Sequence, residues 1–386
     1  MENNGISNIK DKYIESAKKL MNMHDNTVVL VLSLMMWIII IIVIMVYFYY
    51  TGSIVNKSLQ VRECDFVDEI YSTLNGKIHP ITASDPFNHT LKDYYIKSVY
   101  NCCSAGDYKN DYVNVCYLKN SLKQGVRGLD FEIFSINDQP VIATSTSDSF
   151  YIKETFNYVP FVEAMNIINN YAFASSTAPN PTDPIIIHLR IKSSNQKMYN
   201  NFAKILKGYD NRLLGPAFSF ENQGRNLGNL KLSAMMNKIA IIVDRSNNSF
   251  LESKSFYEYI NMTSSSIFCR LLRYYDIKYT PDITELIEYN KLNMTIALPD
   301  KGSNPPNPSP IVVRETGCQF IAMRYQVIDG NVEESDIFFN EAGSAFVLKP
   351  EKLRYIPIVL KTPPPQNPDV SYAPRTIESD YYKIDI

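Results

Sequence analysis

The chain has 386 residues, which suits one large domain or two domains of ordinary size. Its 38 basic and 40 acidic side chains leave a formal net charge of −2, so the charge gives no indication of a nucleic-acid partner. Histidine, the side chain that most readily transfers protons at neutral pH, is scarce. The four histidines are His24, His79, His89 and His188.

The N-terminal part contains one predicted transmembrane helix, residues 27–50. Before it, residues 1–26 carry apolar residues at helical spacing between lysines, which fits an amphipathic helix or a plain solvated one. From Val28 to Val46, Ser33 is the only clearly polar residue, and four aromatic residues follow at 47–50. About 20 apolar residues cross a hydrocarbon core of roughly 30 Å. A buried core helix or a cleaved signal peptide fits so long an uninterrupted run less well.

The distribution of basic residues predicts the orientation of this span. Four lysines precede it and only Lys57 and Arg62 follow closely, so the positive-inside rule places the N-terminus in the cytoplasm. The C-terminal part is then lumenal or extracellular, the type II arrangement. Five sequons agree with this: Asn56, Asn88, Asn247, Asn261 and Asn293. All six cysteines follow the span, and they form disulfides of undetermined pairing or remain buried thiols.

After a polar connector, residues 51–90, strands and helices alternate over residues 91–245. The run 128–134 has a period of two, which places Asp130 and Glu132 on the face opposite its apolar residues. Further strands are predicted at Pro140–Thr144, Pro184–Arg190 and Lys238–Val243, and helices at Tyr158–Phe173 and Asn201–Lys207. The alternation predicts an α/β fold with parallel strands.

The remaining chain is less regular. Residues 246–280 are interpreted as a linker, and residues 281–360 as a second structured region. Its predicted strands are Met294–Leu298, Gln319–Val327 and Ala345–Leu348. The proline-rich run 304–310 requires an extended loop. The tail, residues 361–386, contains Pro363, Pro364 and Pro365, and we expect it to be extended or disordered.

Two blocks of sequence carry a resemblance to a known family. The first contains LKDYYIKSVYNCCS from Leu91, LKQGVRGLDFEIF, PVIATSTS and DPIIIHLRIKSS; the second contains GCQFIAMRYQV and FFNEAGSAFVLKPEKLR. Their order and spacing resemble the X and Y regions of phosphoinositide-specific phospholipase C. The resemblance implies that 91–245 and 281–360 form the two halves of a distorted TIM-type (β/α)8 barrel, with chemistry at the C-terminal ends of the strands.

Active members of that family cleave a phosphodiester with calcium and two histidines, one stabilising the phosphorane and one protonating the leaving oxygen. In this chain the first histidine aligns with Tyr100 and the second with Thr146. A tyrosine titrates near about pH 10 and a threonine not at all in the physiological range. The resemblance therefore implies a site without its proton-transfer groups, and we assign no catalytic residue.

The same comparison implies a remnant calcium site. Asn101 keeps the position of an amide ligand, and Asp130 and Glu132 keep a carboxylate pair in swapped order. The fourth ligand position is taken by Arg190, on the inward side of its strand with His188. Arg190 is expected to pair with the carboxylates, either as a charge cluster that holds the barrel mouth in shape or as a substitute for the calcium charge.

The main hypothesis is a single-pass membrane protein carrying a catalytically degenerate barrel. This pseudoenzyme would serve as a binding or structural module in a viral or organelle membrane, including a virion membrane. Its candidate partners are the membrane, a phosphoinositide or inositol phosphate, and unidentified proteins; no cofactor is expected. The first alternative is an active phosphoric diester hydrolase with calcium at Asn101, Asp130 and Glu132. The second is a scaffold that binds only proteins, for which we expect a barrel mouth plugged by side chains.

A cysteine and a histidine near the barrel mouth could form another catalytic arrangement. Cys102 and Cys103 are predicted near the barrel mouth, and His188 points inward by parity. A cysteine–histidine pair would indicate a nucleophile. The alternative is a disulfide or buried thiol beside a barrel histidine whose hydrogen bonds are satisfied, and the sequence favours it.

Overall fold

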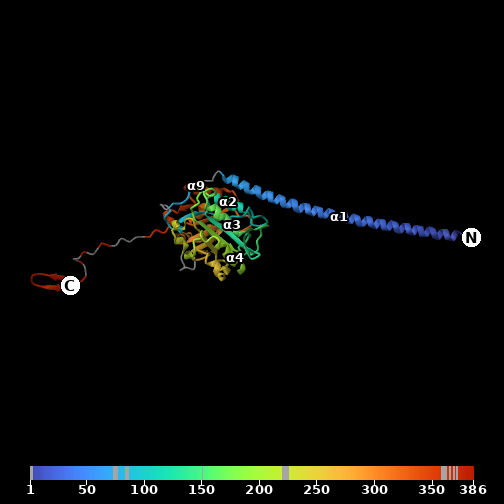
Figure 1. Ribbon diagram of the computed structural model, residues 1–386. Helices are drawn as coiled ribbons and strands as arrows, with labels where there is room; N and C mark the ends of the chain where they lie inside the picture. The colour runs from blue at the N-terminus through green and yellow to red at the C-terminus, as the bar shows by residue number, and fades with distance from the viewer. Residues whose placement is uncertain are drawn as a thin grey trace.

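The structure of the protein is a computed structural model. It describes residues 3–72, 77–82, 87–149, 151–219, 226–357, 363–364, 367, 370 and 373–386. Figure 1 shows a long helix and a C-terminal segment leaving a compact barrel on opposite sides.

The N-terminal helix is longer than the predicted span. Helix α1 covers Asn3–Ser72, and its segment Lys10–Tyr50 is apolar and long enough to cross a membrane, with none of the tested window buried inside the structure. The predicted connector therefore begins as helix, because Val67 and Tyr71 form a stripe at helical spacing that is buried on the barrel. The side chains of His24, Asn56, Lys57 and Arg62 lie outside the described residues.

The main sheet is a nearly closed barrel of parallel strands, in the order β7-β6-β5-β2-β1-β10-β9-β8. The strands are β1 (Tyr94–Val99), β2 (Gly128–Ile136), β5 (Ile185–Ile191), β6 (Ile239–Asp244), β7 (Met262–Ser264), β8 (Cys269–Arg273), β9 (Met294–Leu298) and β10 (Phe320–Met323). The predicted TIM-type α/β barrel is confirmed. Short antiparallel strands extend it: β3 (Gln139–Ile142), β4 (Val159–Pro160) and β11 (Phe346–Leu348).

Helices surround the strands (Figure 1). They are α2 (Val115–Lys123), α3 (Phe161–Ile167) with a π-helical turn at Ile168–Ala172, α4 (Gln196–Lys207), α5 (Lys254–Tyr257), α6 (Tyr274–Lys278), α7 (Ile283–Leu292), α8 (Pro310–Glu315) and α9 (Gly330–Ala342).

Two predicted regions differ from the structure. The linker, residues 246–280, contains the barrel strands β7 and β8, which are too short to show a period in the sequence. In the tail, residues Thr376–Glu378 (β12) and Lys383–Asp385 (β13) form an antiparallel hairpin instead of an extended or disordered chain. Its residues alternate between polar and apolar, with Ile377 opposite Ile384, as a hairpin requires. Parts of the tail, including Pro365, lie outside the described residues.

Strands β2 and β5 divide their side chains between two layers. Outward, toward the helices, lie Leu129, Phe131, Ile133, Ile185, Ile187 and Leu189. The parallel register sets Asp130 beside His188 and Glu132 beside Arg190. All four are almost fully buried, inside the barrel near the C-terminal ends of the strands, as the two-residue period predicts.

The last turns of α1 pack along α2, which leads from the end of β1 toward the start of β2. Cys64 forms a disulfide with Cys116 in the first turn of α2. At the other end of α2, Gln124 donates a hydrogen bond to the Tyr71 carbonyl at 3.2 Å. Helix α1 therefore runs in the same direction as α2. The residues before Cys64 project beyond the C-terminal ends of the barrel strands.

Candidate functional site

A buried ion pair occupies the centre of the barrel mouth. Arg190 donates from Nη2 to Asp130 Oδ2 at 2.9 Å and from Nε to Asp130 Oδ1 at 3.1 Å, a two-bond fork geometry. Both side chains are 3% exposed or less. Burial is the largest single influence and opposes ionisation of Asp130, but the charge of Arg190 and the contacts with His188 together outweigh it and hold the Asp130 pKa below its usual range. In return, Asp130 raises the Arg190 pKa well above its ordinary value, although burial acts against the charge.

Asn101 and His188 complete the contacts of this pair. Arg190 Nη2 also donates to Asn101 Oδ1 at 2.6 Å, and the Asn101 backbone N–H donates to Asp130 Oδ2 at 3.1 Å. Asn101 has a positive φ of 44°, which asparagine tolerates better than most residues. His188 Nδ1 lies 2.7 Å from Asp130 Oδ1, and its Nε2 lies 2.9 Å from Ser264 Oγ. Because a carboxylate only accepts, the neutral ring carries its proton on Nδ1.

Glu132 is held mainly by a serine. Ser145 donates to it from Oγ at 2.6 Å and from its backbone N–H at 3.2 Å. Arg190 Nη1 is 3.7 Å away. Burial raises the Glu132 pKa, and the charge of Arg190 offsets part of that rise. The two carboxylates therefore differ: Asp130 is paired and ionised, whereas ionisation of Glu132 is disfavoured.

Tyr100, which the resemblance predicts at the position of the first family histidine, lies between two guanidinium groups. The Arg190 guanidinium carbon is 4.7 Å from the ring centroid, and that of Arg273 is 5.8 Å away. Arg273 also donates from Nη1 to the Tyr100 hydroxyl at 3.2 Å. The ring stacks edge-on against Tyr108. These contacts make Tyr100 a packing partner of two cations.

Thr146, which the resemblance predicts at the position of the second family histidine, points its hydroxyl at another carboxylate. Its Oγ1 and its backbone N–H both donate to Glu154 Oε2 at 2.7 Å. These bonds contribute to a pKa for Glu154 that is lowered overall, although desolvation acts in the opposite direction. The hydroxyl proton of Thr146 is therefore directed to Glu154.

Sequence reasoning missed the charge cluster at the rim. Asp148, on the loop between β3 and β4, lies 2.5 Å from Arg273 Nη2 and 3.0 Å from Lys301 Nζ. Arg190 and Lys192 lie 3.9 and 3.8 Å from the same carboxylate. These cations come from two distant segments, 190–192 and 273–301. No motif in the sequence links them, so only the fold reveals the cluster.

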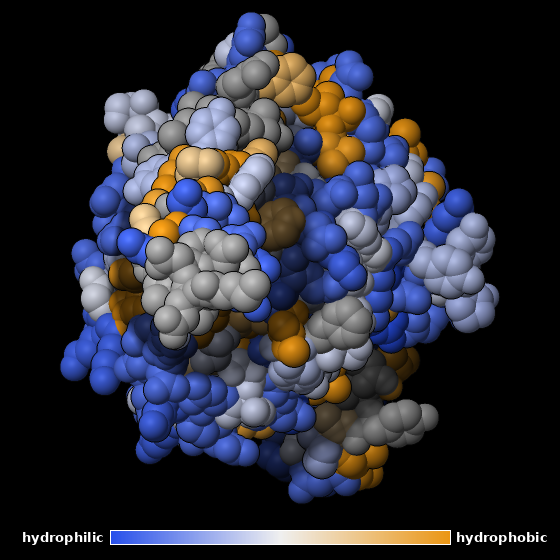
Figure 2. Space-filling view, turned by 90° about the vertical axis from the view of Figure 1, so that its right-hand side faces the viewer, coloured by the Kyte–Doolittle hydropathy of each residue, from blue (hydrophilic) through white to orange (hydrophobic). Residues whose placement is uncertain are grey.

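The mouth is almost filled by side chains. A hollow of about 10 Å³ remains there, roughly the room that one water molecule needs. It is lined by Tyr100, Tyr108, Ser145, Thr146, Ser147, Asp148, Arg273, Asp300, Lys301 and Gly302. Figure 2, viewed from the side toward which α1 projects, shows a mostly hydrophilic face with a hollow near its centre.

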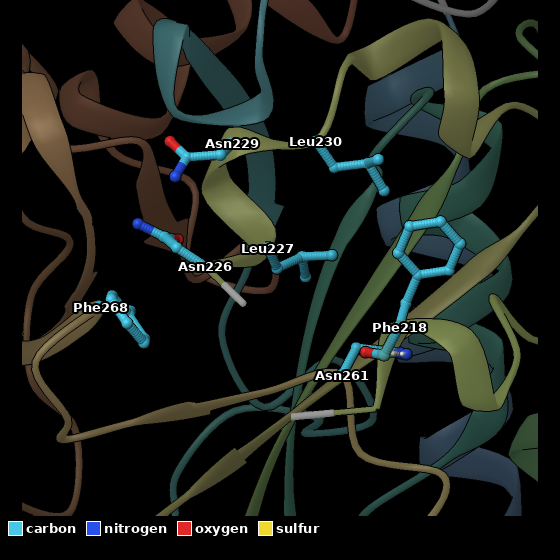
Figure 3. Close-up of a pocket in the computed structure, with 7 residues that line it drawn as sticks. All are labelled: Phe218, Asn226, Leu227, Asn229, Leu230, Asn261 and Phe268. Carbon is cyan, nitrogen blue, oxygen red and sulfur yellow. Dashed lines mark hydrogen bonds between the residues drawn. The ribbon is translucent and has the colours of Figure 1, made fainter. Parts of the chain in front are cut away.

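A larger cavity of about 400 Å³ lies at the opposite end of the barrel, before β6, β7 and β8. Figure 3 shows Phe218 and Phe268 on opposite sides of it, with Leu227 between them. None of its described lining residues titrates; the others are Asn226, Asn229, Leu230 and Asn261. This cavity is therefore unrelated to the charged residues of the mouth.

The described residues do not fit a calcium ion at the predicted position. Arg190 already occupies Asp130 Oδ2 and Asn101 Oδ1, the two oxygens that a metal would need. A guanidinium at hydrogen-bond distance excludes a second cation from the same oxygens. Within the described part of the chain, no group of three or more His, Cys, Asp or Glu side chains is arranged to hold a metal.

The cysteines near the mouth, Cys102 and Cys103, are buried. Burial raises the pKa of Cys102 well above its ordinary value, and its Sγ donates to the Asp130 carbonyl at 3.3 Å. Both ring nitrogens of His188 are already engaged by Asp130 and Ser264. Cys102 and Cys103 are unpaired with each other, whereas Cys64 and Cys116 form the disulfide.

Comparisons with known proteins agree with this fold. Residues 87–245 match the family model for the X domain of phosphatidylinositol-specific phospholipase C. The barrel is similar to crystal structures of PLC21 from L. pealei and from S. officinalis, with TM-scores of 0.56 and 0.54. Each is 18% identical over 70% of this chain, which spans only 38% of either protein. None of the curated proteins compared with the chain matches it in sequence.

The fold is a TIM-type barrel, similar to the barrels of the solved phospholipase C structures. Within this barrel, residues 87–245 correspond to the X domain of phosphatidylinositol-specific phospholipase C. Enzymes of this family are phosphodiesterases. The sequence identity of 18% to the solved structures supports a likeness in fold alone.

Proposed function

We propose that the protein is a membrane-anchored, non-catalytic phospholipase C-like barrel that serves as a binding or structural module. The observation that carries the proposal is the Arg190–Asp130 pair, which occupies the centre of the mouth with 2.9 Å contacts. Arg190 takes the oxygens of Asp130 and Asn101 that a metal would need, and the hollow of about 10 Å³ has no room for a phosphodiester while Asp148 stays in place.

The two aligned positions strengthen the case against catalysis. Tyr100 is engaged by Arg273, and the Thr146 hydroxyl donates to Glu154. Losing one positioned acid or base typically costs about 10²- to 10⁴-fold in rate, and two are replaced. A mouth filled by side chains also favours a structural or protein-binding role over hydrolysis.

Helix α1 supplies the anchor and the orientation. Its residues before Cys64 project past the C-terminal ends of the strands, so the mouth faces the membrane that the helix crosses. From Tyr50 to Cys64, fourteen helical residues at 1.5 Å each hold the mouth about 21 Å from the end of the apolar span. The barrel mouth would therefore bind that bilayer or a protein lying on it.

We place the barrel in a lumen or outside the cell, with the N-terminus in the cytoplasm. The lysines before the span support this orientation. The disulfide Cys64–Cys116 supports it independently, because disulfides persist in oxidising compartments. A lumenal barrel is separated from phosphoinositides of the cytoplasmic leaflet, which argues further against a lipase.

The test is hydrolysis of phosphatidylinositol by the full chain in detergent micelles with calcium, measured as released inositol phosphate. We expect no release above that of the matched variant Asp130→Ala. Turnover that Asp130→Ala abolishes would overturn the proposal and favour an enzyme that binds calcium at Asn101, Asp130 and Glu132.

A further inference from the structure

Four cations converge on one carboxylate at the rim of the barrel. The rim cluster consists of Arg190, Lys192, Arg273 and Lys301 around Asp148, with the nearest contacts at 2.5 and 3.0 Å. Arg190, Lys192 and Arg273 are between 2 and 14% exposed, whereas Asp148 is 39% exposed. Three of the four cations are thus built into the barrel, whereas Lys301, 53% exposed, and Asp148 lie at its surface.

Two of the cations, Arg273 and Arg190, keep their places through contacts other than Asp148, whereas Lys192 donates a hydrogen bond to the Asp148 backbone carbonyl. Arg273 donates from Nη1 to the Pro299 carbonyl at 2.8 Å and to the Tyr100 hydroxyl. Arg190 is held by the fork with Asp130. Burial works against ionisation of Asp148, but Arg273 and Arg190 outweigh it and keep its pKa below the usual range. The result is a pair of fixed guanidinium groups that face a carboxylate from a surface loop.

We propose that the rim cluster is a binding site for an anion of the phosphate class, and that the Asp148 carboxylate occupies it as an internal ligand which the incoming anion displaces. The inference rests on the proposed non-catalytic function, since the anion is bound at the rim and not cleaved. Guanidinium forks suit the oxygens of a phosphate monoester, which carries more charge than one carboxylate.

Displacement is sterically required. The hollow beside Asp148 holds about 10 Å³, so a phosphate cannot enter while the carboxylate stays in place. Asp148 lies in a short run of serines and threonines, 144–149, and Ser147 and Ser149 bond to each other at the exposed side. Turning the Asp148 side chain toward solvent would leave the two hydrogen bonds of the Arg190–Asp130 pair in place.

The experiment uses the full chain in detergent micelles and measures binding of inorganic phosphate by titration calorimetry. Asp148→Asn removes the competing charge, and we expect it to bind phosphate about tenfold more tightly than the unaltered chain, a factor equal to about 1.4 kcal/mol. Asp300→Asn is the matched control: Asp300 lines the same hollow, but among the described residues it forms no ion pair with the cluster. We expect little change from it. Adding Arg273→Gln to Asp148→Asn should abolish binding.

A second arm distinguishes the source of the anion. The Asp148→Asn chain is placed in phosphatidylcholine nanodiscs with or without phosphatidylinositol phosphate, and soluble phosphate is titrated. Competition by the lipid assigns a headgroup as the ligand; unchanged phosphate binding assigns a free anion, and either result supports the site. Equal phosphate affinity with and without Asp148 overturns the displacement, and no binding by any variant overturns the site. Neither failure would indicate that the protein is an enzyme, because the proposed non-catalytic function is tested separately by the hydrolysis assay. Circular dichroism confirms that each variant is folded.

Discussion

Replacing Arg190 by methionine tests whether the ion pair at the barrel mouth holds the site together. The change leaves Asp130 and Glu132 without their central cation, in positions 3% and 1% exposed. Breaking a buried pair by removing one partner typically costs about 3–5 kcal/mol. Three hydrogen bonds from Arg190, at 2.6, 2.9 and 3.1 Å, are lost together. They share one guanidinium, so their separate values of about 1.5–3 kcal/mol do not add.

The loss depends on pH with a definite sign. In the unaltered chain the Asp130 pKa is depressed, so its stabilisation is present above the unfolded pKa of about 3.9 and disappears as the pH falls through the lower folded value. Without Arg190, burial raises the pKa of both carboxylates. As the pH falls, their protonation removes the uncompensated buried charge and reduces the destabilisation of the variant. The difference in unfolding free energy between variant and unaltered chain should therefore be largest at about pH 7 and smaller at about pH 5.

The assay is urea unfolding of the full chain in detergent micelles, followed by far-ultraviolet circular dichroism at both pH values. The matched control adds Asp130→Asn to Arg190→Met, which removes the uncompensated charge and should restore part of the stability. A loss below about 1 kcal/mol at pH 7, or a loss that does not change with pH, would refute the account of the site as a charge-balanced cluster.

Two further changes test the metal position and the anchor. Arg190→Glu supplies a third carboxylate beside Asp130 and Glu132. Calcium should bind the folded state of this variant, increase its unfolding free energy by about 2.7 kcal/mol at a hundredfold excess over Kd, and so raise its thermal midpoint. The unaltered chain should not respond, and equal responses would contradict the role given to Arg190. Cys64→Ser opens a disulfide that closes a sequence separation of 52 residues, which should lower the barrel's unfolding free energy by about 4 kcal/mol. The unaltered chain in reductant is the control. If Cys64→Ser and the unaltered chain have the same urea midpoint in oxidising buffer, the disulfide does not hold α1 on the barrel.

Much of the site follows from local sequence pattern. The two-residue period of 128–134 places Asp130 and Glu132 on the inner face, and the same parity places His188 and Arg190 opposite them. Strand side chains alternate strictly, so the face of each residue needs no knowledge of the rest of the fold. The membrane-spanning length of the apolar run is also a property of a single helix.

Other features escaped because they depend on distant segments. Strands β7 and β8 have three and five residues, too few to distinguish a barrel strand from a linker. The pairing of Cys64 with Cys116 required the docking of α1 on α2. In the tail, polar and apolar residues alternate as in a hairpin, but the prolines before them favoured the prediction of an extended or disordered chain.

The sequence by itself determined the class of fold and the apolar run, and it predicted Tyr100 and Thr146 at the positions of the two family histidines, because each depends on residue identity and short-range spacing. Only the tertiary structure decided that Arg190 pairs with the oxygens of the predicted metal position, that α1 projects from the side of the barrel mouth, and that Lys301 and Arg273 meet Asp148 at the rim. Closure of the barrel brings residues more than 100 positions apart within a few ångströms, and electrostatic interaction depends on that distance and on burial, neither of which is a property of the linear chain.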